Sequence, residues 1–232
     1  MKVSIIGGTG EEGFGLTLRL AAAGHHVTIG SRSQDKGEAT AASAFERLGP
    51  GVSVDGATND RAASVSDVVI VTVPFAGQAE IYRAIKDHVR AEAIVVDCTS
   101  PLATAVGGRA WHVLRPWHGS AAEQAKAILP SGVRMVGAFH TIAGGALQAL
   151  EHPLDSDVLV CGTDPEAKAT VGELVEDIPN LRWVDAGDLT QARIVEPLTA
   201  LLISINRGYR IRDAGFRITG RESWGAPGSS SG

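Results

Sequence analysis

The stretch VSIIGGTGEEG, residues 3–13, decides the fold, because it joins a short apolar run to a glycine-rich turn. The turn contains the pattern G-x-G-x-x-G directly after the apolar run. We predict a strand over 3–6, a helix over 13–23 that ends before a glycine, and a second strand over 27–30. This order of strand, glycine turn, helix and strand is typical of a βαβ unit that binds a dinucleotide.

Each glycine of the pattern has a physical role. Gly8 allows a tight turn, Gly10 lets a pyrophosphate approach the backbone, and Gly13 lets the helix pack close to the strand. The free N–H groups and the positive dipole end at the start of the helix attract the same anion. Glu11 and Glu12 oppose that anion electrostatically, so we expect both side chains to point to solvent. The alternative is a glycine turn that binds no nucleotide.

The end of the second strand selects the form of the dinucleotide. Proteins that bind NAD place Asp or Glu there to hold the ribose hydroxyls. This chain has Ser31-Arg32-Ser33 instead, with Lys36 one turn later. The guanidinium of Arg32 is suited to grip a 2′-phosphate, with hydroxyl donors and a second positive charge beside it. We therefore predict NADP(H) as a cofactor; the alternative for Arg32 is an ordinary exposed side chain.

Strand and helix signals alternate as far as residue 142, except where a Gly-, Pro- and Trp-rich stretch over 100–119 interrupts them. Continuous Val and Ile runs, such as 67–73, which Pro74 ends, are typical of a parallel sheet covered on both faces. We predict an α/β fold in which residues 1–142 form an NADP-binding domain with a Rossmann-type doubly wound parallel sheet. Beyond the first unit, we expect helices over 35–48, 59–65, 78–88 and 121–128 and strands over 52–54, 67–73, 93–97 and 134–138.

The rest of the chain has the pattern of a smaller C-terminal α/β domain over 143–220. We predict strands over 157–161 and 181–184, and helices over 166–178 and 189–207. Residues 221–232 have the composition of a flexible tail.

Composition excludes several classes of protein. Lys and Arg number 21 against 26 Asp and Glu, a net charge of −5, which is the opposite of the basic balance of nucleic-acid-binding proteins. No apolar run reaches the length of a membrane span, so we expect small-molecule partners, no nucleic acid and no membrane span. Cys98 and Cys161 each end an aliphatic run, which predicts buried free thiols, a reducing compartment and a cytoplasmic protein.

Candidate site residues follow the predicted strands at their carboxyl ends, where ligands collect in such sheets. Val73, Pro74 and Phe75 follow one strand and should face the nicotinamide ribose. The segment 98–102 follows the next strand and is either a substrate contact or a plain turn. His140, after the strand over 134–138, is the best titratable candidate for catalysis; its alternative is a structural histidine.

Other chemically suggestive residues have simpler readings. His25, His26, His88 and His152 are interpreted as surface or turn residues. The pair Tyr82 and Lys86 matches the Y-x-x-x-K of short-chain dehydrogenases, but the predicted helix places it away from the ligand edge of the sheet, so the match is accidental. No Cys and His spacing fits zinc, so we predict no metal site, and no hydrolase elbow is found.

The chain resembles the family of coenzyme F420-dependent NADP oxidoreductases from residue 1 to about residue 219. The resemblance rests on Gly7-Gly8-Thr9-Gly10 with Gly13 and Gly15, Gly30-Ser31-Arg32 with Lys36, Val73-Pro74, Ala138-Phe139-His140-Thr141, Asp157 to Gly162, Asp185-Ala186-Gly187, and Val195-Glu196-Pro197-Leu198-Thr199.

The resemblance implies hydride transfer between the nicotinamide of NADP(H) and the deazaflavin of coenzyme F420, with both rings stacked in a cleft between the two domains. Positioning would outweigh acid–base work, and His140 or solvent would take the proton released by reduced deazaflavin. The resemblance also assigns ligand contacts. It places Thr9, Ser31, Arg32 and Lys36 at the 2′-phosphate end of NADP, and Pro101, Leu102, His140, Thr141, Asn206 and Arg207 near the deazaflavin. Ala138 is expected among the cofactor-binding residues.

The stretch 106–119, with two tryptophans and two histidines, falls outside the family pattern and lies where an acceptor would enter. The alternatives are therefore an NADP-dependent reductase with another acceptor (a flavin, a metal, or an imino or keto acid) and an NADP-binding redox sensor without turnover. The last predicted helix has a long apolar face, formed by Ile194, Leu198, Leu201, Leu202 and Ile205. Its burial against a second copy would give a homodimer; burial within the chain is the alternative.

Overall fold

The structure is a computed structural model that describes residues 1–221 and Trp224. The predicted flexible tail over 221–232 therefore lies almost entirely outside the described residues. The strands are β1 (Lys2–Ile6), β2 (His26–Ser31), β3 (Ser53–Thr58), β4 (Val68–Val71), β5 (Ile94–Asp97), β6 (Arg134–Gly137), β7 (Ser156–Gly162) and β8 (Leu181–Asp185). The helices are α1 (Glu11–Ala22), α2 (Gln34–Leu48), α3 (Asn59–Val65), α4 (Phe75–Ile85), α5 (Ala121–Ile128), α6 (Gly144–Gln148), α7 (Pro165–Glu176) and α8 (Ala192–Tyr209), with 3₁₀ turns η1 (Ala103–Val106) and η2 (Leu189–Gln191).

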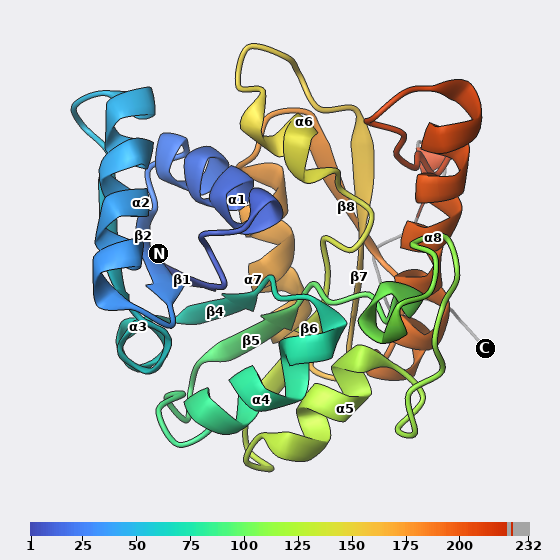
Figure 1. The fold of residues 1–232 in the computed structure, drawn as a ribbon, viewed down its shortest axis with the longest axis horizontal. Coiled ribbons are helices and arrows are strands. Elements are labelled where there is room, and N and C mark those ends of the chain that lie inside the picture. Colours follow the sequence, from blue (N-terminus) through green and yellow to red (C-terminus); the bar gives the residue numbers. More distant parts are fainter. Residues whose placement is uncertain (222–223, 225–232) are drawn as a thin grey trace.

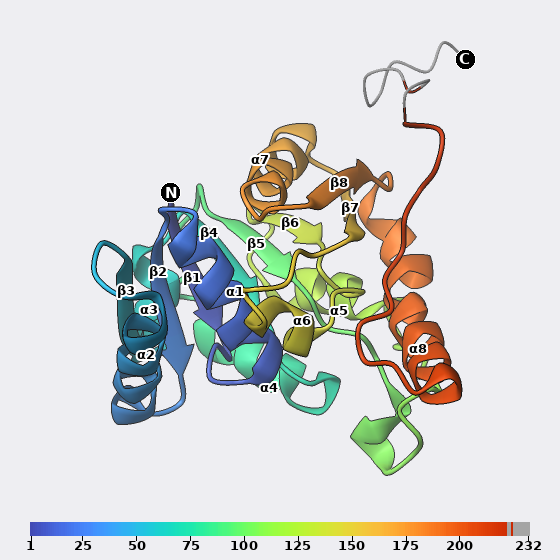
Figure 2. The same ribbon diagram turned by 90° about the horizontal axis from the view of Figure 1, so that it is seen from above.

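All strands join one sheet in the order β3-β2-β1-β4-β5-β6-β7-β8 (Figures 1 and 2). The first six run parallel, in the order typical of dinucleotide-binding sheets. The strand order reverses between β1 and β4, where Ile5 lies beside Ile70. Such a reversal opens a crevice at the carboxyl ends of the strands, so the predicted doubly wound α/β fold is confirmed and the ligand edge is located.

The sequence predicts that the strand over 134–138 is the last strand of its sheet, but the sheet continues beyond β6. β7 pairs with β6 in the antiparallel sense, through Val136 with Gly162 and Gly137 with Cys161, and β8 then pairs with β7 in parallel. β6 would otherwise have an open edge of unpaired backbone groups, which β7 satisfies. The division into domains over 1–142 and 143–220 stays a prediction, because the sheet runs through both.

Alternate residues of the inner strands face two separate cores. Ile5 and Ile70 pack on one face with side chains of α1 and α7, whereas Ile6 and Val71 pack on the other with side chains of α3, α4 and α5. A period of two with apolar residues on both sides is the signature of a strand buried on both faces. The predicted helices therefore cover both sides of the sheet and leave its edge of strand ends free for a site.

A buried arginine fixes the chain that follows β6. Arg19 of α1 donates hydrogen bonds to the backbone carbonyls of Ala146, Leu147, Ala149 and His152, over 2.8–3.1 Å. Four carbonyl acceptors are the partners that a buried guanidinium requires. They hold α6 against α1.

Two interpretations of single residues are decided by burial. Tyr82 is fully buried and donates to Asp97 over 3.0 Å, so the Y-x-x-x-K match is accidental, as interpreted. His25 is buried, so it is not a surface residue, while His88 and His152 are exposed. His25 lies in the connection from α1 to β2, and its ring nitrogens contact Asp177 at 2.9 Å and the N-terminal amino group at 3.2 Å. Periodicity alone gives no sign of partners so far away in the sequence.

Candidate active site

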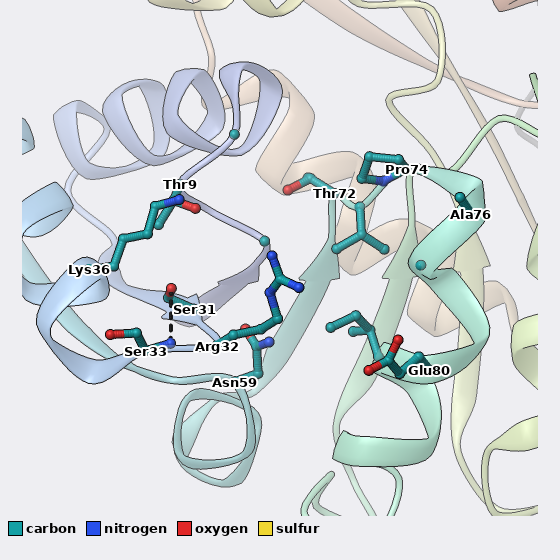
Figure 3. A pocket seen from close by; sticks show the side chains of 15 residues that line it. Thr9, Ser31, Arg32, Ser33, Lys36, Asn59, Thr72, Pro74, Ala76 and Glu80 are labelled. Carbon is teal, nitrogen blue, oxygen red and sulfur yellow. Dashed lines mark hydrogen bonds between the residues drawn. The ribbon is translucent and has the colours of Figure 1, made fainter. Parts of the chain in front are cut away.

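A first cavity, of about 540 Å³, lies beside the glycine turn at the carboxyl ends of β1, β2 and β4. Figure 3 shows side chains from the turn, from the end of β2 and from α4 around it. Its lining includes most of the predicted NADP residues: Thr9, Gly10, Ser31, Arg32, Lys36, Val73 and Pro74. Gly8 and Gly13 lie behind this surface, and Phe75 begins α4 beside it.

The glycines leave the backbone of the turn open. A methyl group at position 10 would meet nothing closer than the carbonyl oxygen of Gly7 at 3.4 Å, whereas one at position 13 would lie 2.7 Å from Cα of Gly8. The positive φ of the turn falls on Gly7, at +78°, and not on Gly8, where the sequence analysis placed the tight turn. Gly10 therefore leaves the start of α1 open to an anion, while Gly13 lets α1 approach the turn closely.

The polar groups of the first cavity fit a phosphorylated nucleotide. Arg32 and Lys36 are exposed, and neither makes an ion pair with any described residue. Beside them, the Ser33 N–H donates to Oγ of Ser31 over 3.3 Å (Figure 3). Buried Asn59 lines the same cavity, and its amide oxygen has no partner among the described residues. Free cations and an orphaned acceptor are what a ligand with a phosphate and hydroxyl groups would satisfy.

The lining also includes Asn59, Ala76, Gly77, Glu80 and Ile81, which the sequence did not single out. Thr72 lines the cavity as well, in the segment after β4 that the sequence places at the crevice edge. Glu80 and Ile81 lie on α4, and only the packing of that helix against the sheet brings them to the cavity.

A second cavity, of about 790 Å³, lies on the other side of the glycine turn. It is bounded by the start of α1, by the segment 140–154 and by α8. His140, Glu11 and Glu12 line it, together with Thr199 and Asn206. An elongated ligand that crosses the turn from the first cavity would bring its far end here.

Glu12 faces inward, so the expectation that it points to solvent is wrong; Glu11 is exposed, as expected. Oε1 of Glu12 is shielded from water and has no hydrogen-bond partner among the described residues. The close approach of Gly144 to the backbone of Glu12 shows the cause: α6 covers the first turn of α1. Burial, and to a lesser degree the nearby Asp97, raises the pKa of Glu12 to about 8. At neutral pH the group is therefore mostly an uncharged carboxylic acid, which removes the predicted conflict with a pyrophosphate.

His140 enters the second cavity as a neutral side chain. It follows Phe139, a buried residue with a left-handed φ of +65°, a conformation that β-carbon sterics disfavour. Neither ring nitrogen has a partner within the described part of the chain, and burial lowers the pKa of His140 to about 4. An uncharged imidazole without a partner is able to exchange a hydrogen bond with a ligand, but it is a weak base.

α8 joins the segments around this cavity. Oγ1 of Thr199 contacts Oγ of Ser100 at 2.6 Å and donates to the carbonyl of His140 over 2.7 Å. One turn earlier, the carboxylate oxygens of Glu196 accept from the N–H groups of Ala121 and Ala122, at the start of α5. The carboxyl-end loops of β5 and β6 are therefore fixed by one helix.

The remaining predicted residues lie around the cavity rather than on its surface. Ala138, Pro101 and Thr141 are buried, and Leu102 forms a bridge to Val113. Arg207 lies with its guanidinium carbon 4.2 Å from the ring centre of Trp111.

The segment 103–119, called the arm below, projects beside the C-terminal end of α8 (Figure 2). Trp111 anchors it through stacking with Arg207 and with Arg109. Trp117, close to the return of the chain to α5, is 96% exposed. The arm includes the stretch 106–119, which falls outside the family pattern.

Within residues 1–221 and Trp224, no three His, Cys, Asp or Glu side chains are grouped to hold a metal ion. In the same part of the chain, no helix combines the length and apolar character needed to cross a membrane.

Comparisons with known proteins agree with this geometry. Residues 2–101 match the family model described as NADP oxidoreductase, coenzyme F420-dependent. The chain is 42% identical to the F420-dependent NADP reductase of Methanothermobacter thermautotrophicus, across 94% of this chain and 95% of that protein. It is 40% identical to the F420-dependent NADP reductase of Methanocaldococcus jannaschii, across 96% and 100%. A solved structure of a candidate F420-dependent NADP reductase from Arthrobacter sp. FB24 superposes with a TM-score of 0.76 at 26% identity, across 94% and 99%.

Proposed function

The chain belongs to the family of coenzyme F420-dependent NADP oxidoreductases, and from that premise we propose that it transfers a hydride between NADP(H) and coenzyme F420. The observation that carries the proposal is the pair of cavities on either side of the glycine turn. The first has unpaired cations for a nucleotide phosphate, and the second has room and hydrogen-bonding groups for a further ring system.

The first cavity holds the nucleotide end of NADP(H) in this proposal. Arg32 and Lys36 take the 2′-phosphate with the hydroxyls of Thr9 and Ser31, because these groups converge from three elements on one opening. The turn around Gly10 takes the pyrophosphate. Val73, Pro74 and Phe75 lie along the path toward the second cavity.

The second cavity holds the reacting ends. When bound, the nicotinamide and deazaflavin rings supply the hydride chemistry themselves, so the protein has to align them and exclude water. His140 offers a neutral hydrogen-bonding group, held in place through its backbone carbonyl by Thr199. Pro101, Leu102, Ala138, Thr141 and Arg207 shape and support the surrounding walls. Because its pKa is about 4, His140 is a weak base, and in this proposal it orients its ligand. The proton that reduced deazaflavin releases passes to solvent.

One assay tests the proposal. Purified protein is mixed with oxidised F420 and NADPH, and loss of the visible absorbance of the deazaflavin is followed, with NADH and with FMN in parallel. We expect bleaching with NADPH and F420 only. Binding of NADPH without bleaching would retain the nucleotide site and exclude F420 as the acceptor.

We also propose a homodimer and a cytoplasmic location. Ile194 and Leu201 of α8 are 64% and 49% exposed, which supports burial of this helix face against a second copy. Cys98 and Cys161 are buried free thiols, which supports a reducing compartment.

A further inference from the structure

The surface beside the second cavity carries unpaired positive charge. Two segments form it: the arm, and residues 203–212, which end α8 and begin the chain that follows it. Neither segment contains Asp or Glu, although the whole chain has a net charge of −5. The guanidinium groups of this surface are exposed, and none of them makes an ion pair or a hydrogen bond with another described residue. The set, called the basic surface below, is Arg109, Arg115, Arg207, Arg210 and Arg212.

Two of these guanidinium groups are held close together by one aromatic ring. The guanidinium carbons of Arg109 and Arg207 lie 5.4 and 4.2 Å from the ring centre of Trp111. Each contact of a cation with the ring is favourable, but the two cations repel each other. No carboxylate of the described chain pairs with either of them. An anion bound beside both would offset this repulsion.

The basic surface reaches the second cavity. Arg212 lines that cavity together with Asn206, the residue before Arg207. The backbone N–H of Ile211 donates to the carbonyl of Asn206 over 3.0 Å, and the N–H of Ala214 donates to its Oδ1 over 3.0 Å. These two hydrogen bonds fix the loop that carries Arg212 to the end of α8. Positive charge is therefore held at the edge of the cavity by the fold itself.

The two ends of the second cavity differ in charge. At the glycine turn, exposed Glu11 borders the cavity, and the pyrophosphate of a bound dinucleotide would add negative charge there. At the end of α8, the acid that lines the cavity is Asp213, next to Arg212 and the rest of the basic surface. A ligand with an aromatic ring at one end and several anionic groups at the other is therefore favoured with its ring toward the turn and its anionic groups toward the basic surface.

Coenzyme F420 has this form. Its deazaflavin ring carries a ribityl chain, which continues through a phosphodiester into a tail of glutamate carboxylates. We propose that the basic surface binds the phosphate and carboxylate groups of this tail, and that it thereby selects the complete coenzyme over the bare deazaflavin. Guanidinium groups suit both anions, because each can donate two parallel hydrogen bonds to a phosphate or a carboxylate. The inference rests on the proposed function, since it requires the deazaflavin ring to occupy the second cavity.

Kinetics of the wild-type protein give the primary test. Oxidised F420 is compared with a deazaflavin that ends at the ribityl chain, called the tailless deazaflavin, at saturating NADPH. We expect kcat/KM to be about tenfold higher for F420 at low salt. Raising the salt from about 0.05 to 0.5 M should reduce this ratio by about threefold or more, because salt screens exposed charges. The effect of salt on NADPH is common to both acceptors, so it cancels in the ratio.

Matched variants assign the effect to the basic surface. R109Q combined with R212Q removes one guanidinium group from the arm and one from the loop after α8, and should lower the ratio about fivefold. R109K combined with R212K keeps both charges and should retain most of the ratio. R61Q combined with R83Q is the control, because these exposed arginines of α3 and α4 line neither cavity. That control should leave the ratio unchanged.

The possible failures are distinguishable. Equal salt responses of the two acceptors, or an unchanged ratio in the R109Q/R212Q variant, would overturn the inference while hydride transfer itself stands. A higher Kd of NADPH in that variant, with an unchanged ratio, would overturn it as well, by assigning the surface to the nucleotide. Failure of NADPH to reduce either acceptor would overturn the proposed function and this inference together.

Discussion

The hydroxyl group of Thr199 donates a hydrogen bond to the backbone carbonyl of His140 over 2.7 Å, across 59 positions of sequence. The same hydroxyl contacts Oγ of Ser100 at 2.6 Å. One side chain of α8 therefore sets the distance between the loops that follow β5 and β6, and both loops border the second cavity.

Replacement of Thr199 by valine should loosen these loops without a change in side-chain volume. Loss of two hydrogen bonds, each of about 0.5–1.5 kcal/mol, predicts a fall of roughly tenfold in kcat/KM for F420. The Kd of NADPH should change by less than about twofold, since the charged contacts that hold its phosphates lie in the first cavity, which is built without α8. Steady-state kinetics and a fluorescence titration measure the two effects. Thr199→Ser keeps the hydroxyl and should retain most of the activity; equal losses in both variants would contradict the positioning role.

Arg32 should determine the preference for the phosphorylated dinucleotide. Removal of one charge-assisted contact in Arg32→Ala predicts a loss of NADPH affinity of about 1.5–3 kcal/mol, or roughly 10- to 100-fold. NADH lacks the 2′-phosphate and serves as the control within the same variant, with an expected change of less than about threefold. Direct binding titrations decide the matter, and equal weakening of both ligands would show that Arg32 does not contact the phosphate.

Gly13→Ala should destabilise the fold at the glycine turn. The added methyl group would lie 2.7 Å from Cα of Gly8, and backbone atoms must move to relieve this overlap. We expect a loss of about 1–3 kcal/mol in the free energy of unfolding, measured in urea. Gly208→Ala in α8 is the matched control, because no atom lies within 4 Å of the new carbon there. Equal stability of the two variants would argue against the close approach of α1 to the turn.

Burial of His140 should reduce stability in acid. Its pKa is lowered from 6.5 to about 4 in the folded state, so below pH 6.5 the unfolded chain binds a proton that the folded chain does not. Burial of His140 therefore costs the free energy of unfolding almost nothing above about pH 6.5, and it lowers that free energy progressively as the pH falls toward 4. Between pH 7.5 and 5.0 the loss amounts to about 2 kcal/mol. His140→Gln should lack this component when urea unfolding is compared at the two pH values. Parallel pH dependence in both proteins would show that the imidazole titrates normally.

The proposed dimer makes a prediction about mass. Ile194→Asp combined with Leu201→Asp places two charges on the exposed face of α8 and should convert a dimer into a monomer, measured by light scattering. Phe45→Asp is the control: Phe45 is 49% exposed, but it lies on α2 at the opposite side of the molecule (Figure 1). A wild-type protein of monomeric mass would refute the dimer.

The sequence was sufficient for features whose signals are local. The run 3–13 predicts β1, the glycine turn and α1, because apolar periodicity and glycine spacing act over a few residues. Arg32 and Lys36 could be placed at the first cavity because the strand order of a βαβ unit fixes where β2 ends. Both lie there in the structure.

Features that depend on distant contacts were not predictable in this way. β7 was recognised as a strand, but its antiparallel pairing with β6 depends on the open edge of the sheet. Glu12 was expected in solvent because charged residues in a first helical turn are usually exposed, and only the packing of α6 on α1 shields its Oε1. The role of Thr199 likewise requires the position of α8 relative to two loops, which no local pattern encodes.

The two cavities also differ in where along the chain their residues occur. All the residues that line the first cavity lie between Gly7 and Ile81, whereas the second cavity requires residues as late as Asp213. During translation, all residues of the first cavity are therefore synthesised well before the last residues of the second cavity. A nascent or prematurely terminated chain that folds this far has a place for NADP(H) but no partner site for hydride exchange. The second cavity, by contrast, is complete only once the chain has been made as far as Asp213.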